Sequence, residues 1–293
     1  MSLISVITVI GYIAYNESRP KTTYEIPPPP LVANAKSISL PESMTFAGEE
    51  VPLGEPDVLE RLDRELHINT YWHNNTIFLM KRSGRWFPEI EKILSENGIP
   101  DDFKYLTTIE GSLRNDVSPK NAVGFWQIRK ATGRELGLEV SRDVDERYDP
   151  IKSTRAACKY LNKAYKKFGS WTMVAASYNR GMAGMSRAIE NQREDDYYNL
   201  MLNEETSRYL FRILAIKEIF ENPEKYSFDI SEEHMYLPFE LSYVKVTENV
   251  DNLVEWSKQH EISYKTLKFY NPWLRNNKLN VKSGKTYQIA LPN

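Results

Sequence analysis

Apolar residues recur every three or four positions through the middle of the chain, from about residue 57 to about residue 228. That period places them on one face of a helix. The best-defined helices are predicted over residues 86–94, 150–168, 170–181 and 205–220. Asp149 before Pro150 suits a helix start, and Gly98 and Gly169 suit helix ends.

A glutamate lies where this pattern favours an apolar residue. Phe103, Leu106 and Glu110 are three and four positions apart, so in a helix the Glu110 carboxylate shares their buried face. Two interpretations are open. In the first, Gly111 ends the helix and Glu110 is a half-solvated residue of its last turn. In the second, burial and the negative end of the helix raise the pKa of Glu110 and make it a general acid.

The helical period is lost between residues 111 and 148. Turn-forming residues cluster there, at Ser118, Pro119, Asn121 and Gly124. A loop or short strands that lead into a helix are predicted. Trp126, Gln127 and Arg129 follow this cluster. Because binding and catalytic groups are often carried by loops on a rigid scaffold, this region is a candidate site.

The pattern changes again after residue 236. FELSYVKV and KTYQIALP alternate apolar and polar positions, and LVEWSKQH and YKTLKFYN between them indicate short helices. Strand, helix, helix, strand predicts a separable small domain over residues 236–293, after a helical domain over residues 57–230.

The N-terminal region is of a different kind. Residues 3–15 are uncharged and apolar, a length that suits a signal sequence better than a bilayer span. Residues 16–56 hold eight of the 16 prolines, which predicts an extended tether without a core. The expected location is therefore the cell envelope, in the periplasm, with residues 1–15 either cleaved or kept as a membrane anchor.

Composition excludes several classes of protein. Of the 293 residues, 41% are hydrophobic and 27% charged, which is globular usage. The net charge of −2 argues against a nucleic-acid partner. Cys158 is the single cysteine, so no intrachain disulfide can form, and it is expected in the core. The four histidines have no metal-ligand spacing, so no metal is expected. No other cofactor is predicted.

Motifs in the middle of the chain resemble a known family. IEGSLRNDVSPKNAVGFWQIRKATGRELGL, DERYDPIKSTRAACKYL, AASYNRG and EETSRYLFRILA are similar, in this order, to the catalytic domain of lytic transglycosylases of glycoside hydrolase family 23, of the membrane-bound lytic transglycosylase D type. The resemblance covers roughly residues 80–225. It implies a lysozyme-like helical domain and an overall α+β, mainly α, fold.

The resemblance also implies roles for individual residues. Glu110 corresponds to the catalytic acid, and Gln127, in a G-x-W-Q turn with Gly124 and Trp126, to the glutamine that faces the sugar. The A-Y-N-x-G motif is matched by Tyr178, Asn179 and Gly181, with Arg180 where alanine is frequent, and the E-T-x-x-Y motif by Tyr209. Without the resemblance, Tyr178 and Tyr209 would be interpreted as core aromatics.

The residue after the glutamate departs from the family pattern. Serine is usual there, whereas this chain has Gly111, with Ser112 one position later. One hypothesis is that Gly111, which can adopt a positive φ, lets the helix end under the carboxylate, so that Ser112 takes the place of the family's serine in substrate binding. In that case serine at position 111 would be tolerated or would raise activity. If Gly111 instead needs a positive φ, serine at that position would cost stability without helping the reaction.

The C-terminal segment resembles a LysM module, a small βααβ fold that binds chains containing N-acetylglucosamine. Its I-S-x-x-x-L and N-P features are present, but the usual G-D-T before the first helix is replaced by Glu248, Asn249 and Val250. The resemblance therefore supports the fold better than it supports glycan binding.

The two resemblances together imply a peptidoglycan lytic transglycosylase, with peptidoglycan glycan strands as its partner and protein partners undefined. Such an enzyme cleaves the MurNAc–GlcNAc β-1,4 bond without water and leaves 1,6-anhydroMurNAc ends. The alternatives are a lysozyme-type muramidase, in which water attacks, and a non-catalytic peptidoglycan-binding protein. Most glycosidases pair two carboxylates, and no second motif carboxylate is identified in this sequence.

Overall fold

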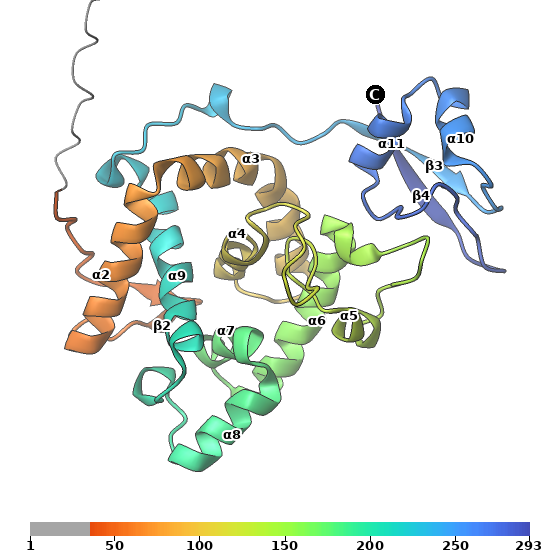
Figure 1. Ribbon diagram of the computed structural model, residues 1–293. Helices are drawn as coiled ribbons and strands as arrows, with labels where there is room; N and C mark the ends of the chain where they lie inside the picture. The colour runs from red at the N-terminus through yellow and green to blue at the C-terminus, as the bar shows by residue number, and fades with distance from the viewer. Residues whose placement is uncertain (1–35) are drawn as a thin grey trace, which may run out of the picture. The chain divides into compact units, whose positions relative to one another are not determined.

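The computed structural model describes residues 36–293 (Figure 1). The predicted signal or anchor at residues 1–15, and the start of the predicted tether, lie outside the described residues. The helices before the C-terminal domain are α2 (Pro56–Tyr71), α3 (His73–Glu96), α4 (Leu106–Gly111), α5 (Lys130–Glu135), α6 (Pro150–Phe168), α7 (Trp171–Arg180), α8 (Met182–Gln192) and α9 (Glu204–Glu221). Within residues 36–293, none of the helices combines the length and the apolar character that crossing a bilayer requires.

The predicted helices are confirmed within α3, α6, α7 and α9, although α3 begins at His73, well before the predicted residue 86. Local chemistry sets the ends of α6. The Asp149 carboxylate accepts hydrogen bonds from the backbone N–H groups of Ile151 and Lys152, at 2.9 and 3.0 Å. These bonds satisfy donors that the first turn of α6 leaves unpaired. Gly169 ends α6 with φ 72°, a conformation that glycine adopts without strain.

The helices enclose one hydrophobic core. α2 and α7 both pack on α9, and α7 also packs on α6. Cys158 of α6 is fully buried, as predicted, and burial raises the pKa of its thiol to about 12.

The segment that carries Glu110 is less regular than predicted. A 3₁₀ turn, Asp101–Tyr105, leads into the short helix α4. Phe103 and Leu106 are both fully buried, so the apolar face inferred from the spacing is confirmed. The helix ends one residue later than expected, because Ser112, at φ 51°, adopts the left-handed conformation after Gly111.

The predicted tether is wrong for its last part. β1 (Thr45–Phe46) and β2 (Glu49–Glu50) form an antiparallel hairpin. Phe46 has no exposed surface and belongs to the main core. The Glu49 carboxylate accepts hydrogen bonds from the N–H groups of Trp171 and Thr172, at 2.5 and 2.9 Å, at the start of α7. The proline content concealed a short segment that is part of the helical domain.

The C-terminal domain has the predicted order β3 (Leu241–Val246), α10 (Leu253–Gln259), α11 (Tyr264–Tyr270) and β4 (Tyr287–Pro292). β3 pairs antiparallel with β4, and Tyr243 lies opposite Ala290. This domain has its own core. The α+β, mainly α, fold is therefore confirmed.

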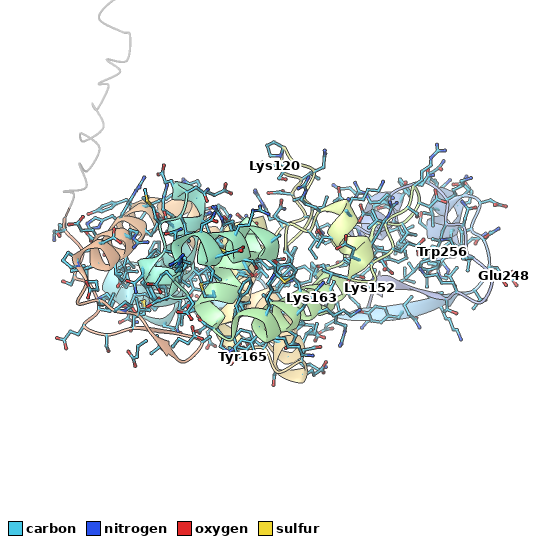
Figure 2. All side chains as sticks on the ribbon, turned by 90° about the horizontal axis from the view of Figure 1, so that it is seen from below. Lys120, Lys152, Lys163, Tyr165, Glu248 and Trp256 are labelled. Carbon is cyan, nitrogen blue, oxygen red and sulfur yellow. The ribbon has the colours of Figure 1, made fainter. Side chains whose placement is uncertain are left out.

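The two domains are joined by more than the connecting chain. The connection lies along α3 (Figure 1), where the Tyr236 N–H donates to the Lys81 carbonyl at 2.9 Å. Lys152, near the start of α6 on the side toward the C-terminal domain (Figure 2), places its ammonium 5.5 Å from the centre of the Trp273 ring of that domain.

Candidate active site

The Glu110 carboxylate is held by a tyrosine from a distant part of the chain. Tyr209 of α9 donates a hydrogen bond from its hydroxyl to Oε1 of Glu110, over 2.5 Å. Tyr209 is only 1% exposed, whereas Glu110 is half-buried. Tyr209, predicted to bind substrate, therefore lies beneath the carboxylate and orients it.

The surroundings of Glu110 favour its neutral form. Burial raises the pKa of Glu110, and this effect outweighs the hydrogen bond from Tyr209 and the nearby Arg212, which both lower it. Glu205 adds a smaller upward contribution. The pKa of Glu110 is therefore above its ordinary value of 4.5, as the general-acid interpretation requires.

Glu110 lies in a cleft of about 570 Å³. The predicted residues Gln127, Tyr178 and Asn179 line the same cleft. Lys120, on the loop between α4 and α5, also lines it and extends outward at the edge of the molecule (Figure 2). The cleft thus brings together four predicted residues from three separate motifs: Glu110, Gln127, Tyr178 and Asn179. Glu110 and Asn179 are 69 positions apart in the sequence.

The turn that carries Gln127 is closed by its own backbone. Val123 and Ile128 exchange two N–H to carbonyl hydrogen bonds, both of 3.1 Å. The Gln127 side chain donates to the Gly124 carbonyl at 2.9 Å. Trp126 is fully buried and donates from its indole N–H to the Thr154 hydroxyl at 2.8 Å. The predicted loop is confirmed, and Trp126 anchors it in the core.

Tyr178 and Asn179 connect this turn to α9. The Tyr178 hydroxyl donates to the Trp126 carbonyl at 2.8 Å. The Asn179 side chain donates to Glu205 at 3.2 Å and accepts from the Thr206 hydroxyl at 2.8 Å. Tyr178 is therefore more than a core aromatic, because its ring lines the cleft while its hydroxyl braces the Gln127 turn.

The structure separates Ser112 from the other predicted site residues. Ser112 lines a second hollow, of about 330 Å³, together with Trp72, Arg208 and Arg212. Its carbonyl accepts a hydrogen bond from Arg82 at 3.2 Å. The geometry gives no support to the hypothesis that the Ser112 hydroxyl replaces the family's serine beside Glu110.

The explanation offered for Gly111 is also wrong. The positive φ belongs to Ser112 and Leu113, whereas Gly111 has helical conformation. Glycine is required at position 111 because an added Cβ would lie 2.5 Å from the Gly124 carbonyl oxygen and 2.7 Å from Cα of Phe125. Both atoms are backbone, so they cannot move aside cheaply.

Sequence reasoning missed three residues of the site. Glu205 lines the cleft as a second carboxylate; it is the first residue of the E-T-x-x-Y motif, which could have identified it. Arg212 donates to the Ile109 carbonyl at 3.1 Å and so holds the end of α4. Tyr160 also lines the cleft and packs edge-on against Tyr178; neither residue stands out in the sequence from ordinary helix positions.

Within residues 36–293, His, Cys, Asp and Glu side chains nowhere form a group that could hold a metal ion.

Comparison with protein families gives two matches. Residues 95–201 match the transglycosylase SLT domain, and residues 242–293 match the soluble lytic transglycosylase C-terminal LysM-like domain. The chain therefore contains an SLT transglycosylase domain followed by a LysM-like domain, which confirms the resemblance seen in the sequence.

The chain is homologous to membrane-bound lytic murein transglycosylase D of Escherichia coli (strain K12), with 30% identity over 190 residues. The match covers 62% of this chain and 41% of that relative, so the chain corresponds to less than half of it. A putative tributyltin chloride resistance protein of Alteromonas sp. (strain M-1) is 31% identical over 115 residues, which cover 38% of this chain and 56% of that protein.

Proposed function

We propose that this protein is a peptidoglycan lytic transglycosylase that cleaves the MurNAc–GlcNAc β-1,4 bond without water. The observation that carries the proposal is the half-buried Glu110, with a raised pKa, oriented by Tyr209 in a cleft lined by Gln127, Tyr178 and Asn179. The SLT domain match and the homology to a lytic murein transglycosylase support the same activity.

In the proposed reaction, Glu110 first acts as the acid. Since Oε1 accepts the Tyr209 hydrogen bond, the proton of the neutral acid resides on Oε2 and is transferred to the glycosidic oxygen of the leaving sugar. Glu110, now a carboxylate, removes the proton of the C6 hydroxyl of the MurNAc residue whose glycosidic bond is broken. That hydroxyl oxygen bonds to the anomeric carbon and closes a 1,6-anhydro ring. The substrate's own N-acetyl group stabilises the positive charge that develops between the two steps.

A second candidate activity is hydrolysis by a lysozyme-type muramidase. The observation in its favour is Glu205, a second carboxylate on the same cleft, because paired carboxylates can activate water. Against it, Glu205 is exposed and accepts a hydrogen bond from Asn179. The proposed lytic reaction needs only one acid.

Mass spectrometry of muropeptides released from purified sacculi tests these alternatives together. The lytic reaction gives products that end in 1,6-anhydroMurNAc, each lighter by one water than the hydrolytic product. Reducing MurNAc ends would establish the muramidase instead. Absence of any release by folded protein would leave the non-catalytic peptidoglycan-binding alternative.

We further propose that the protein acts in the cell envelope and that residues 1–15 export it or anchor it. The apolar, uncharged residues 3–15 and the membrane-bound relative support this location. Fractionation of cells that express the full chain, and the same experiment without residues 1–15, tests both parts. Recovery of the full chain in the cytoplasm would contradict them.

A further inference from the structure

The LysM-like domain and the helical domain share a short pairing of extended backbone. The N–H of Asp145 donates to the Trp273 carbonyl at 2.9 Å, and the N–H of Arg275 donates to the Asp143 carbonyl at 2.7 Å. Residues 143–145 belong to the chain that leads from α5 to α6 in the helical domain. Residues 143–145 of the helical domain therefore pair with the LysM-like domain as a short strand-like segment.

Side chains strengthen this pairing. Val144 is 1% exposed and is part of the LysM-like domain's own core. The Asp143 carboxylate accepts hydrogen bonds from the side-chain amides of Asn276, at 2.7 Å, and Asn280. The C-terminal domain is therefore less separable than its sequence predicts, because its core includes a residue from the helical domain.

The next residues carry this contact to the active-site loop. Asp145 forms a two-point ion pair with Arg147, with nitrogen–oxygen distances of 2.7 and 2.9 Å. Asp145 and Arg147 are 6% and 7% exposed, so the pair is shielded from solvent. An ion pair with this fork geometry fixes the plane of the guanidinium, which a single contact would leave free to turn.

Arg147 holds both ends of the loop that contains Gln127. Its Nη1 donates to the carbonyls of Asn121 and Ile128, each at 3.1 Å. Its backbone also approaches the loop, since a Cβ on Gly124 would lie 2.3 Å from the Arg147 carbonyl oxygen. The loop that Arg147 holds carries Gln127 into the cleft and packs against Gly111, the residue next to Glu110.

We propose that the LysM-like domain positions the catalytic loop of the helical domain. Arg147 is the positioning residue through which the contact between the LysM-like domain and residues 143–145 holds this loop. The physical basis is one continuous set of contacts, from Asn276 and Asn280 through residues 143–145 to Arg147 and the carbonyls of Asn121 and Ile128. A module that only tethered the enzyme to glycan would need none of these contacts. The catalytic consequence rests on the proposed lytic activity, whereas the structural consequence does not.

Amide hydrogen exchange on the full chain tests the structural part without substrate. The interface variant combines Asn276→Ala with Asn280→Ala and removes the donors to Asp143. The matched control is Asn252→Ala, which removes the side-chain cap of α10 in the same domain, because the Asn252 side chain accepts from the N–H groups of Val254 and Glu255 and not from the Asp143 pairing. The amides of Val123 and Ile128 report on the loop, because each is hydrogen-bonded to the other's carbonyl.

Exchange at Val123 and Ile128 is expected to accelerate about fivefold in the interface variant and in Arg147→Lys, and to stay at the wild-type rate in Asn252→Ala. Lysine keeps the charge beside Asp145 but lacks both the fork that pairs with Asp145 and the Nη1 group that donates to the two carbonyls. Unchanged exchange in the interface variant, or equal acceleration in the control, overturns the proposal.

Turnover of a soluble GlcNAc–MurNAc tetrasaccharide tests the catalytic part. The interface variant is expected to lose about fivefold in kcat with a smaller change in KM, and combining it with Arg147→Lys should cost less than the product of the separate losses. Fully multiplicative losses overturn the route through Arg147. If the wild-type chain cleaves nothing, the proposed function fails, and hydrogen exchange still decides whether the LysM-like domain positions the loop.

Discussion

The hydroxyl of Tyr209 lies 2.5 Å from Oε1 of Glu110, although 99 positions separate the two residues in the sequence. This contact and burial act on the pKa of Glu110 in opposite directions. Burial raises the pKa of Glu110, and the hydrogen bond lowers it part of the way back. The balance leaves an acid that is oriented and still able to transfer its proton.

Glu110→Gln is expected to reduce the rate of muropeptide release by about a hundredfold or more, because an amide cannot donate the proton and take one back. The amide oxygen can still accept the Tyr209 hydrogen bond, so the variant should fold. Rates from purified sacculi and circular dichroism check both points. Glu204→Gln is the matched control, since Glu204 is exposed on the same helix as Tyr209; near-wild-type activity of the Glu110→Gln variant would disprove the assignment.

The stability of the protein should record the raised pKa of Glu110. A carboxyl group whose pKa is raised on folding contributes stability that is complete below its unfolded pKa and is lost as pH rises through its folded pKa. Glutamine does not titrate. The Tm of Glu110→Gln relative to wild type should therefore be higher at about pH 7 than at about pH 4. A difference that is constant with pH would contradict the raised pKa.

Tyr209→Phe should change the pH dependence as well as the rate. Losing a hydrogen bond that favours the carboxylate raises the pKa of Glu110 further, so the decline of kcat at high pH should move to higher pH. The maximal rate should fall about tenfold, because the carboxyl group is no longer oriented.

Tyr226→Phe is the matched control for this experiment. Tyr226 is also a buried tyrosine that donates to a glutamate, Glu218, at 2.9 Å, and neither residue lines the cleft. The control should lose stability and keep the wild-type pH profile. A shift of the Tyr209→Phe profile toward lower pH would show that the hydrogen bond does not act on the Glu110 pKa in this way.

Gly111→Ser is expected to lower the free energy of unfolding by about 1–3 kcal/mol, the usual cost of overpacking. Its Cβ would lie 2.5 Å from the Gly124 carbonyl oxygen, so the Gln127 turn must shift to accept it. Activity should fall with stability. Gly54→Ala is a suitable control, because a Cβ there meets nothing within 4 Å. Wild-type stability of Gly111→Ser in a denaturant titration would show that the two segments can separate easily.

Ser112→Ala is expected to leave the rate within about twofold of wild type, as for a surface change that removes no essential contact. Ser112→Gly should stabilise the protein by about 1 kcal/mol, since Ser112 has φ 51° and glycine adopts that conformation without strain. Steady-state rates and Tm values measure both effects. A large loss of rate in Ser112→Ala would restore the idea that this hydroxyl serves the reaction.

Glu49→Ala should destabilise the helical domain by about 1–2 kcal/mol, because the Glu49 carboxylate caps the first N–H groups of α7 and faces the positive end of its dipole. Glu50→Ala is the control, as Glu50 is the exposed neighbour in the same strand. Equal Tm values for the two variants would mean that the hairpin contributes nothing to the stability of the domain through this contact.

Sequence alone determined the elements whose causes are local. The four helices followed from apolar spacing and from end residues such as Asp149 and Gly169. The C-terminal domain followed from two alternating segments around two helical ones. A resemblance to family motifs assigned four residues to one site, namely Glu110, Gln127, Tyr178 and Asn179. Such a resemblance indicates which residues lie close together in the folded protein, whereas spacing along one chain does not.

Tertiary structure decided everything that depends on contacts between distant segments. Glycine is required at position 111 because the Gly124 carbonyl packs directly against it, and no local sequence preference indicates that contact. Phe46 is buried although it lies among prolines, because the helices offer it a core. Val144 completes the core of a domain that begins about a hundred residues later. Local propensity sets backbone conformation, but burial and close approach are properties of the assembled chain.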